Sequence, residues 1–98
     1  MASSIRMTPQ ELRDGAIYLE QRKAECMDLL GQMNTKVNEI TSNWEGSAQN
    51  SFVETFKEMY NQISQALPQT VEGIENMLNG AADGLEQADE QIASAFRG

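Results

Sequence analysis

Apolar residues recur between positions 12 and 44 in alternating steps of four and three, and nine of the ten positions in this series are apolar. The exception is Lys23, whose long stem can cover apolar surface while its ammonium stays in water. A repeat of about 3.5 residues is typical of a helix that packs one apolar stripe against another helix. The series comprises Leu12, Ala16, Leu19, Lys23, Cys26, Leu30, Met33, Val37, Ile40 and Trp44.

A second apolar stripe follows residue 46 and predicts a second long helix. Two successive steps of four, from Ile63 through Leu67 to Val71, interrupt its rhythm and change the local supercoil. Pro68 lies in this interruption, so we expect a bend there. A break into three helices is the alternative, but the period resumes at once after Pro68 and favours one bent helix. The stripe comprises Val53, Phe56, Tyr60, Ile63, Leu67, Val71, Ile74, Leu78, Ala81, Leu85, Ala88, Ile92 and Ala95.

Capping residues set the expected boundaries. The string Thr8-Pro9-Gln10-Glu11 combines an N-cap hydroxyl, a proline at the first helical position and a glutamate at the third. The single tryptophan stands at the break between the stripes, in Asn43-Trp44-Glu45-Gly46-Ser47, where either Asn43 or Ser47 could cap the second helix. We predict one domain over residues 1–98, with a mobile tail 1–7, a helix 8–43, a turn 44–46, a helix 47–82 bent near Pro68, and a C-terminal tail 83–98.

These elements predict an all-α fold, an antiparallel helix-turn-helix hairpin. Because the second helix outruns the first, roughly the last 15–18 residues would lack a partner in the same chain. This overhang begins near Asn79-Gly80 and contains Gly84, and glycine weakens a helix. We therefore expect the overhang to fray in the free protein.

Apolar residues beside the stripes make each helix too apolar for a two-helix contact, so the hairpin is expected to dimerise into an elongated four-helix bundle with two-fold symmetry. Antiparallel pairing of the first helices would place Cys26 near the two-fold axis. The flanking residues are Ile17, Met27, Leu29, Phe52, Met59 and Met77. The predicted hairpin and dimer seam comprises Leu12, Leu19, Cys26, Leu30, Met33, Val37, Ile40, Phe56, Ile63 and Leu67.

Composition agrees with a helical chain and excludes several function classes. A net charge of −8 repels phosphate backbones, so we expect no nucleic-acid partner. The chain has no histidine, and this removes the usual general base and the commonest metal ligand. For its one cysteine, Cys26, we favour a buried position over a reactive thiol. Scattered carboxylates at helical spacing are expected to be solvated. We therefore predict no enzymatic activity, no metal and no cofactor.

No stretch approaches the ~18 apolar residues of a membrane span, and the N-terminus lacks the apolar core of a secretory signal peptide. With its length, its capped first helix and the Trp44-Glu45-Gly46 turn, the whole chain resembles the WXG family. These are the small ESAT-like (Esx) proteins exported by the type VII secretion system of Gram-positive bacteria and mycobacteria. The resemblance implies a helical hairpin that pairs with itself or with a related WXG protein.

The resemblance also implies an export signal in two parts. Trp44 and Gly46 match the turn motif of the family, and a C-terminal pattern of hydrophobic residues around one aspartate fits Leu85, Asp89, Ile92 and Phe96. The mycobacterial tyrosine of the tail is missing here, which points to a Firmicutes-type protein. In an antiparallel dimer, each tail is expected beside the turn of the partner.

Plainer interpretations of the same residues stay open. Trp44 could plug the end of the hairpin and donate its indole N–H to a carbonyl or to water, and the tail could be an ordinary amphipathic helix end. As function we predict a secreted, virulence-associated substrate that the type VII secretion ATPase complex recognises as a folded dimer. The alternatives are a membrane-active, pore-forming effector that acts on a host membrane at acidic pH, and an adaptor or chaperone partner for other secreted substrates.

Overall fold

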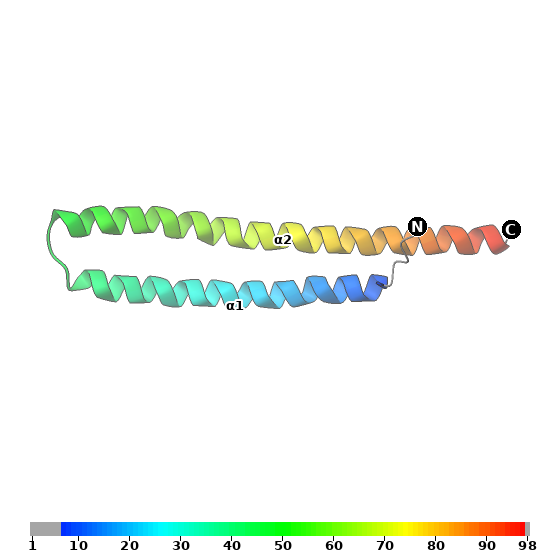
Figure 1. The fold of residues 1–98 in the computed structure, drawn as a ribbon, viewed down its shortest axis with the longest axis horizontal. Helices are drawn as coiled ribbons and strands as arrows, with labels where there is room; N and C mark the ends of the chain where they lie inside the picture. The colour runs from blue at the N-terminus through cyan, green and yellow to red at the C-terminus, as the bar shows by residue number, and fades with distance from the viewer. Residues whose placement is uncertain (1–6, 98) are drawn as a thin grey trace, which may run out of the picture. The chain divides into compact units, whose positions relative to one another are not determined.

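The computed structural model describes residues 7–97, in which the chain forms two helices and no strand. Helix α1 is Pro9–Ser42 and helix α2 is Ser47–Arg97, and a short connection joins them (Figure 1). The predicted all-α helical hairpin is confirmed. Most of the predicted N-terminal tail, residues 1–6, and the last residue of the predicted C-terminal tail, Gly98, lie outside the described residues.

The start of α1 is fixed by the expected capping box. The backbone N–H of Glu11 donates to Thr8 Oγ1 at 3.1 Å, and the backbone N–H of Thr8 donates to Glu11 Oε2 at 3.1 Å. The backbone N–H of Leu12 donates to the Thr8 carbonyl at 3.2 Å. Thr8 therefore satisfies donors that the first helical turn leaves unpaired.

Helix α2 includes Pro68 and runs on through residues 83–97. Because proline has no N–H, the Ser64 carbonyl loses the donor that position 68 supplies in other helices. The alternative of three helices is wrong, because one helix runs from Ser47 through Pro68 to Arg97. The residues we separated as a C-terminal tail belong to the same helix in the structure.

The chain divides into two compact units, and each unit contains a part of both helices. One unit, which we call the terminal unit, combines the chain up to Gln21 with the chain from Val71; the other, the turn unit, is Arg22–Thr70. The single domain over residues 1–98 stays a prediction. Two antiparallel helices have no further layer to connect distant turns, so each turn contacts only the turns opposite it.

Within the turn unit, the contact between the helices uses only a part of the predicted seam. Asn34 and Thr41 turn towards α2, whereas Met33 and Ile40, one position earlier, are 59% and 57% exposed. Cys26 is exposed as well, so the buried position that we favoured for it is wrong for the single chain. In this unit, the half-buried or buried positions of α1 are Lys23, Met27, Leu30, Gly31, Asn34, Val37 and Thr41.

The cause of this difference is the pitch of a straight helix. From Lys23 to Thr41, five steps cover 18 residues, which matches ~3.6 residues per turn and not the ~3.5 of a supercoiled heptad. The same drift brings Ser64 to the contact in α2 and leaves Ile63 42% exposed. Of the predicted seam, Leu12, Leu19, Leu30, Val37, Phe56 and Leu67 are half-buried, while Cys26, Met33, Ile40 and Ile63 face outwards.

In the terminal unit the helices meet through small residues. Ala16 is 4% and Ala82 0% exposed, and a Cβ added to Gly15 would lie 3.7 Å from Leu78 Cδ1. Among the described residues no large side chain is fully buried. A chain that hides so little apolar surface has little hydrophobic free energy to hold it together.

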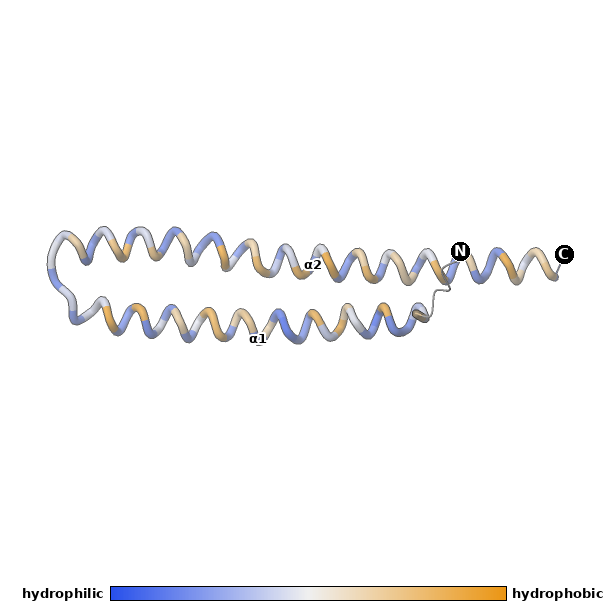
Figure 2. The backbone as a smooth tube through the Cα atoms, viewed as in Figure 1, coloured by the Kyte–Doolittle hydropathy of each residue, from blue (hydrophilic) through white to orange (hydrophobic). Residues whose placement is uncertain are grey.

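Orange apolar and blue polar residues alternate along both helices in Figure 2. Across residues 7–97, neither helix contains a stretch that is both long enough and apolar enough to cross a membrane.

Candidate functional site

The turn between the helices is closed by one carbonyl. The Thr41 carbonyl accepts a hydrogen bond from the backbone N–H of Trp44 at 3.2 Å and another from Gln49 Nε2 at 3.1 Å. Gln49 lies in the first turn of α2, so its side chain joins the start of that helix to the end of α1. Thr41 itself is 5% exposed, and its hydroxyl donates to the Val37 carbonyl at 2.9 Å.

Gly46 occupies the N-cap position of α2. Its carbonyl accepts the backbone N–H of Asn50 at 3.3 Å, and its φ is +115°. Neither of the two caps that we considered is used, because Ser47 is already helical and Asn43 serves the other helix. The Asn43 side-chain amide donates to the Glu39 carbonyl at 3.4 Å, at the end of α1.

Trp44 lies at the surface of the turn unit and not inside it. Its side chain is 39% exposed and packs at an interplanar angle of 50° against Phe52, 5.6 Å away between ring centroids. Phe52 is 44% exposed. Within residues 7–97 the indole nitrogen makes no hydrogen bond. The pair offers a partner two apolar rings and one free donor, which is the combination that makes aromatic residues effective in interfaces.

Replacing Gly46 by alanine tests the backbone of the turn. A Cβ at position 46 meets nothing within 4 Å, so only the φ of +115° opposes it. We expect Gly46→Ala to lower the free energy of unfolding by about 1–3 kcal/mol.

A matched control exists in α1. Gly31 also has nothing within 4 Å of an added Cβ, but it lies within α1 and its φ is not positive. Gly31→Ala should therefore raise the free energy of unfolding by up to ~1 kcal/mol. Urea unfolding followed by circular dichroism measures both, and changes of the same sign in the two variants would contradict the strain argument.

Four outward-facing side chains form a shallow apolar hollow on the turn unit. Cys26, Leu29 and Met33 come from α1 and Ile63 from α2, and we call these four residues the outer apolar face. Leu30 and Leu67 line the bottom of the hollow between the helices. Leu29 and Met33 are 51% and 59% exposed. Aliphatic side chains gathered in this way typically mark a protein interface.

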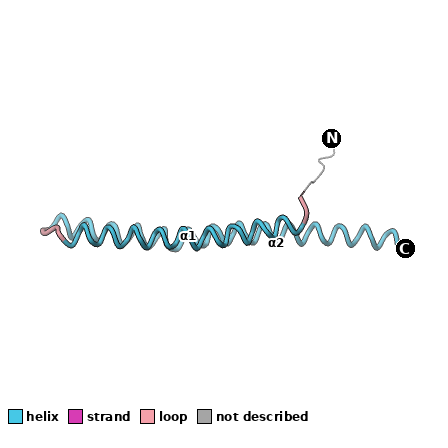
Figure 3. Tube along the Cα trace, turned by 90° about the horizontal axis from the view of Figure 1, so that it is seen from below, coloured by secondary structure: helices cyan, strands magenta, loops and turns pink. Residues whose placement is uncertain are grey.

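The C-terminal motif lies on the part of α2 that extends past the start of α1 (Figures 1 and 3). Leu85, Asp89, Ile92 and Phe96 follow one another at helical spacing and share one side of α2. Leu85 is half-buried against the rest of the terminal unit, whereas Ile92 is 58% and Phe96 88% exposed. The structure thus places the motif on a helix with a largely uncovered apolar side.

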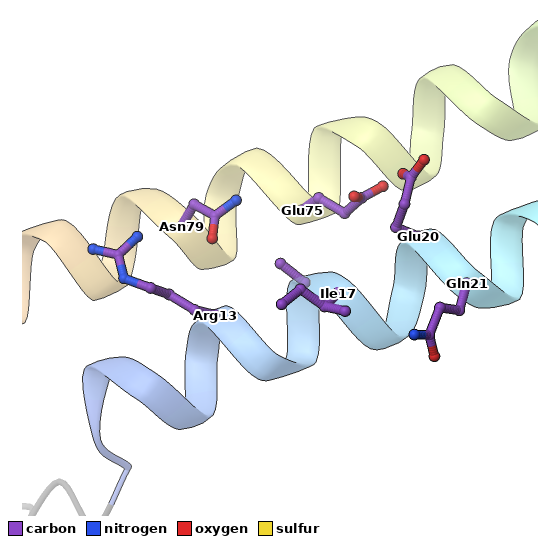
Figure 4. Close-up of a pocket in the computed structure, with 7 residues that line it drawn as sticks. Arg13, Ile17, Glu20, Gln21, Glu75 and Asn79 are labelled. Carbon is purple, nitrogen blue, oxygen red and sulfur yellow. The ribbon is translucent and has the colours of Figure 1, made fainter.

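Arg13 joins α1 to α2 just before this motif. Its Nη2 donates to Asp83 Oδ1 at 2.7 Å and to Glu86 Oε1, and its Nε donates to Glu86 Oε1 at 3.1 Å. The hydrogen bonds that Arg13 donates to Asp83 and then to Glu86 raise its pKa above the ordinary value. Arg13 borders a groove on the terminal unit with Ile17 and Glu20 of α1 and Glu75 and Asn79 of α2 (Figure 4).

Sequence analysis missed the contacts of Arg13, Thr41 and Gln49. No local pattern indicates them, because each joins residues whose distance depends on how the two helices are paired. Among residues 7–97 there is no group of three potential metal ligands.

Residues 4–90 match the sequence profile of the family WXG100, described as proteins of 100 residues with WXG. The chain is 29% identical over 92 residues to the type VII secretion system extracellular protein A of Staphylococcus aureus strain USA300. That alignment covers 94% of each protein.

Solved structures give the same fold. The EsxA protein of Geobacillus thermodenitrificans is 26% identical, with a TM-score of 0.68, and the match covers 92% of this chain and 97% of that protein. The secreted protein EsxB of Bacillus anthracis, in its E54Q variant, is 25% identical with a TM-score of 0.66. Here the match covers 85% of this chain and 88% of that protein.

Proposed function

This chain belongs to the WXG100 family, and from that premise we propose that it is a non-enzymatic substrate of a type VII secretion system, released from a Gram-positive cell. The observation that carries the proposal is the turn at Trp44 and Gly46. The two residues that define the family profile stand where the helices meet, Gly46 with a φ of +115° and Trp44 with its ring at the surface. The similarity to the staphylococcal extracellular protein A supports the same conclusion.

The exported form in this proposal is a homodimer that pairs through the outer apolar face. The single chain exposes 7583 Å², whereas a compact protein of this mass exposes about 5,600 Å². The surplus exceeds the ~800 Å² that each partner contributes to a stable interface of standard size. A second copy supplies an equally apolar surface, and two-fold symmetry brings the same patch of each chain together.

Two regions are proposed to be read by the secretion ATPase complex. One is the turn, with Trp44 and Gly46, and the other is the apolar side of the C-terminal helix. An amphipathic helix can dock into a groove through residues at this spacing, and Asp89 beside the apolar residues can fix the register. The second region comprises Leu85, Asp89, Ile92 and Phe96.

Comparison of culture supernatants tests the proposed function. A strain that produces the protein should release it, and an otherwise identical strain without the secretion ATPase should retain it in the cells. A cytoplasmic marker protein measured in the same supernatants controls for lysis. Equal amounts of the protein in both supernatants would falsify export by this route.

A further inference from the structure

The side of the C-terminal helix that lies away from the export motif carries a row of polar residues. They follow one another in steps of three, four, four and three residues, so they lie on one side of α2. The motif residues Leu85, Ile92 and Phe96 lie on another side of the helix. We call this set the polar row, and it comprises Asp83, Glu86, Glu90, Ser94 and Arg97.

Arg13 of α1 contacts Asp83 and Glu86, the first two residues of the polar row. Its guanidinium reaches Asp83 at 2.7 Å and contacts Glu86 with two nitrogens, so it binds two successive turns of α2 to α1. The Arg13 side chain is 34% exposed, and the side chains of Asp83 and Glu86 are 62% and 52% exposed, so these contacts lie at the surface. A guanidinium that serves two carboxylates also restricts rotation better than a single contact.

Arg97 is the last residue of the polar row and contacts the two residues of the row that precede it. Its Nη2 donates to Glu90 Oε1 at 2.8 Å and to Ser94 Oγ at 3.3 Å, two turns and one turn back along the same helix. Arg97 stands in the last turn of α2, where a positive charge also interacts favourably with the helix dipole. The two arginines therefore anchor opposite ends of one polar row.

We propose that Arg13 and Arg97 are positioning residues that keep residues 85–97 helical in the free protein, so that the export motif is presented already folded. The role of the folded motif in export rests on the proposed function. Gly80 and Gly84 weaken the helix at this point, and two anchors compensate for them. A motif that is already helical loses less conformational entropy when it docks than one that must fold on its receptor.

Hydrogen exchange on the purified full-length protein tests the two anchors directly. We expect Arg13→Gln and Arg97→Gln each to speed amide exchange in residues 87–97, and the double variant to speed it about fivefold or more. Exchange in residues 22–70 should stay unchanged. Lys36→Gln is the matched control, because Lys36 contacts Glu39 at 3.7 Å on the same helix of the other unit.

Salt dependence and charge reversal distinguish two causes of faster exchange, the loss of electrostatic contacts and a general loss of packing. Raising the ionic strength should speed exchange of residues 87–97 in the unaltered protein and hardly at all in the double variant. Arg13→Glu combined with Asp83→Arg and Glu86→Arg should restore slow exchange.

Unchanged exchange in the double variant, or an increase spread equally over residues 22–70, would overturn the proposal. Export of the same variants is measured separately in culture supernatants. Failure of export in every strain would contradict the proposed function and leave the exchange result standing.

Discussion

Combining Met33→Asp with Ile63→Asp is expected to convert the proposed dimer into a monomer and to lower the melting temperature. Both side chains belong to the outer apolar face and are 59% and 42% exposed in the single chain. The substitutions therefore remove no large buried side chain from the chain itself. Any loss of stability must therefore come from the contacts that a second chain makes with the outer apolar face.

The expected magnitude follows from burial in the dimer. Covering a large aliphatic side chain contributes about 1.5–3 kcal/mol, and two-fold symmetry doubles the number of altered sites. An aspartate in the same place adds the cost of desolvating a carboxylate. For a domain of this size, each 1 kcal/mol changes the melting temperature by about 4–8 °C, so we expect a fall of more than 10 °C.

Sedimentation equilibrium gives the mass, and circular dichroism at low and high protein concentration gives the melting temperature. In the unaltered protein the melting temperature should rise with concentration, as mass action requires of a dimer. Thr35→Asp with Gln65→Asp is the matched control, since both residues are exposed and each stands two positions further along the same helix. The proposed dimer is contradicted if the variant and the control show the same mass and melting temperature.

Loss of export with preserved folding is the second large effect that we expect. Trp44→Ala removes the exposed indole and its contact with Phe52 at 5.6 Å, and truncation after residue 84 removes the motif from Leu85 onwards. Each change should reduce the protein in the culture supernatant to the level of a strain without the secretion ATPase. Because Trp44 is 39% exposed, its replacement should cost less stability than the loss of a buried tryptophan.

Two matched variants sharpen this experiment. Trp44→Phe keeps a ring pair with Phe52 and should retain partial export, which would show that the aromatic surface is read. Gln91→Ala changes an exposed residue within the C-terminal helix and should leave export unchanged. Immunoblots of cells and supernatants, with circular dichroism of the purified variants, give both readouts, and full export of Trp44→Ala or of the truncated protein contradicts a signal in two parts.

Helical periodicity was sufficient to predict the two helices, the turn and the capping box, because these depend on residues close together in the chain. It was not sufficient to decide which side of each helix faces the other. Met33 and Asn34 differ by one position, and only the pitch of the paired helices brings Asn34 inwards. The apolar side chain of Met33 favours an inward position, whereas the structure of the single chain leaves it 59% exposed.

The candidate site shows the same limit. Trp44, Gly46 and the C-terminal motif could be found from their positions in the sequence and from the family resemblance. The N-cap was missed because side-chain caps were considered and Gly46 caps with its backbone carbonyl. The contact of Gln49 with Thr41 spans the turn, so it could not be found before the turn geometry was known.

The small size of the buried residues affects how the protein responds to heat. Ala16 and Ala82, at 4% and 0% exposed, are the buried hydrophobic residues of the described chain. The heat capacity of unfolding comes mainly from apolar surface that becomes hydrated, and a lone hairpin has little such surface to expose. The free energy of unfolding of a lone hairpin should therefore vary little with temperature. A pronounced maximum would arise only when a second chain adds its own apolar surface to the folded state.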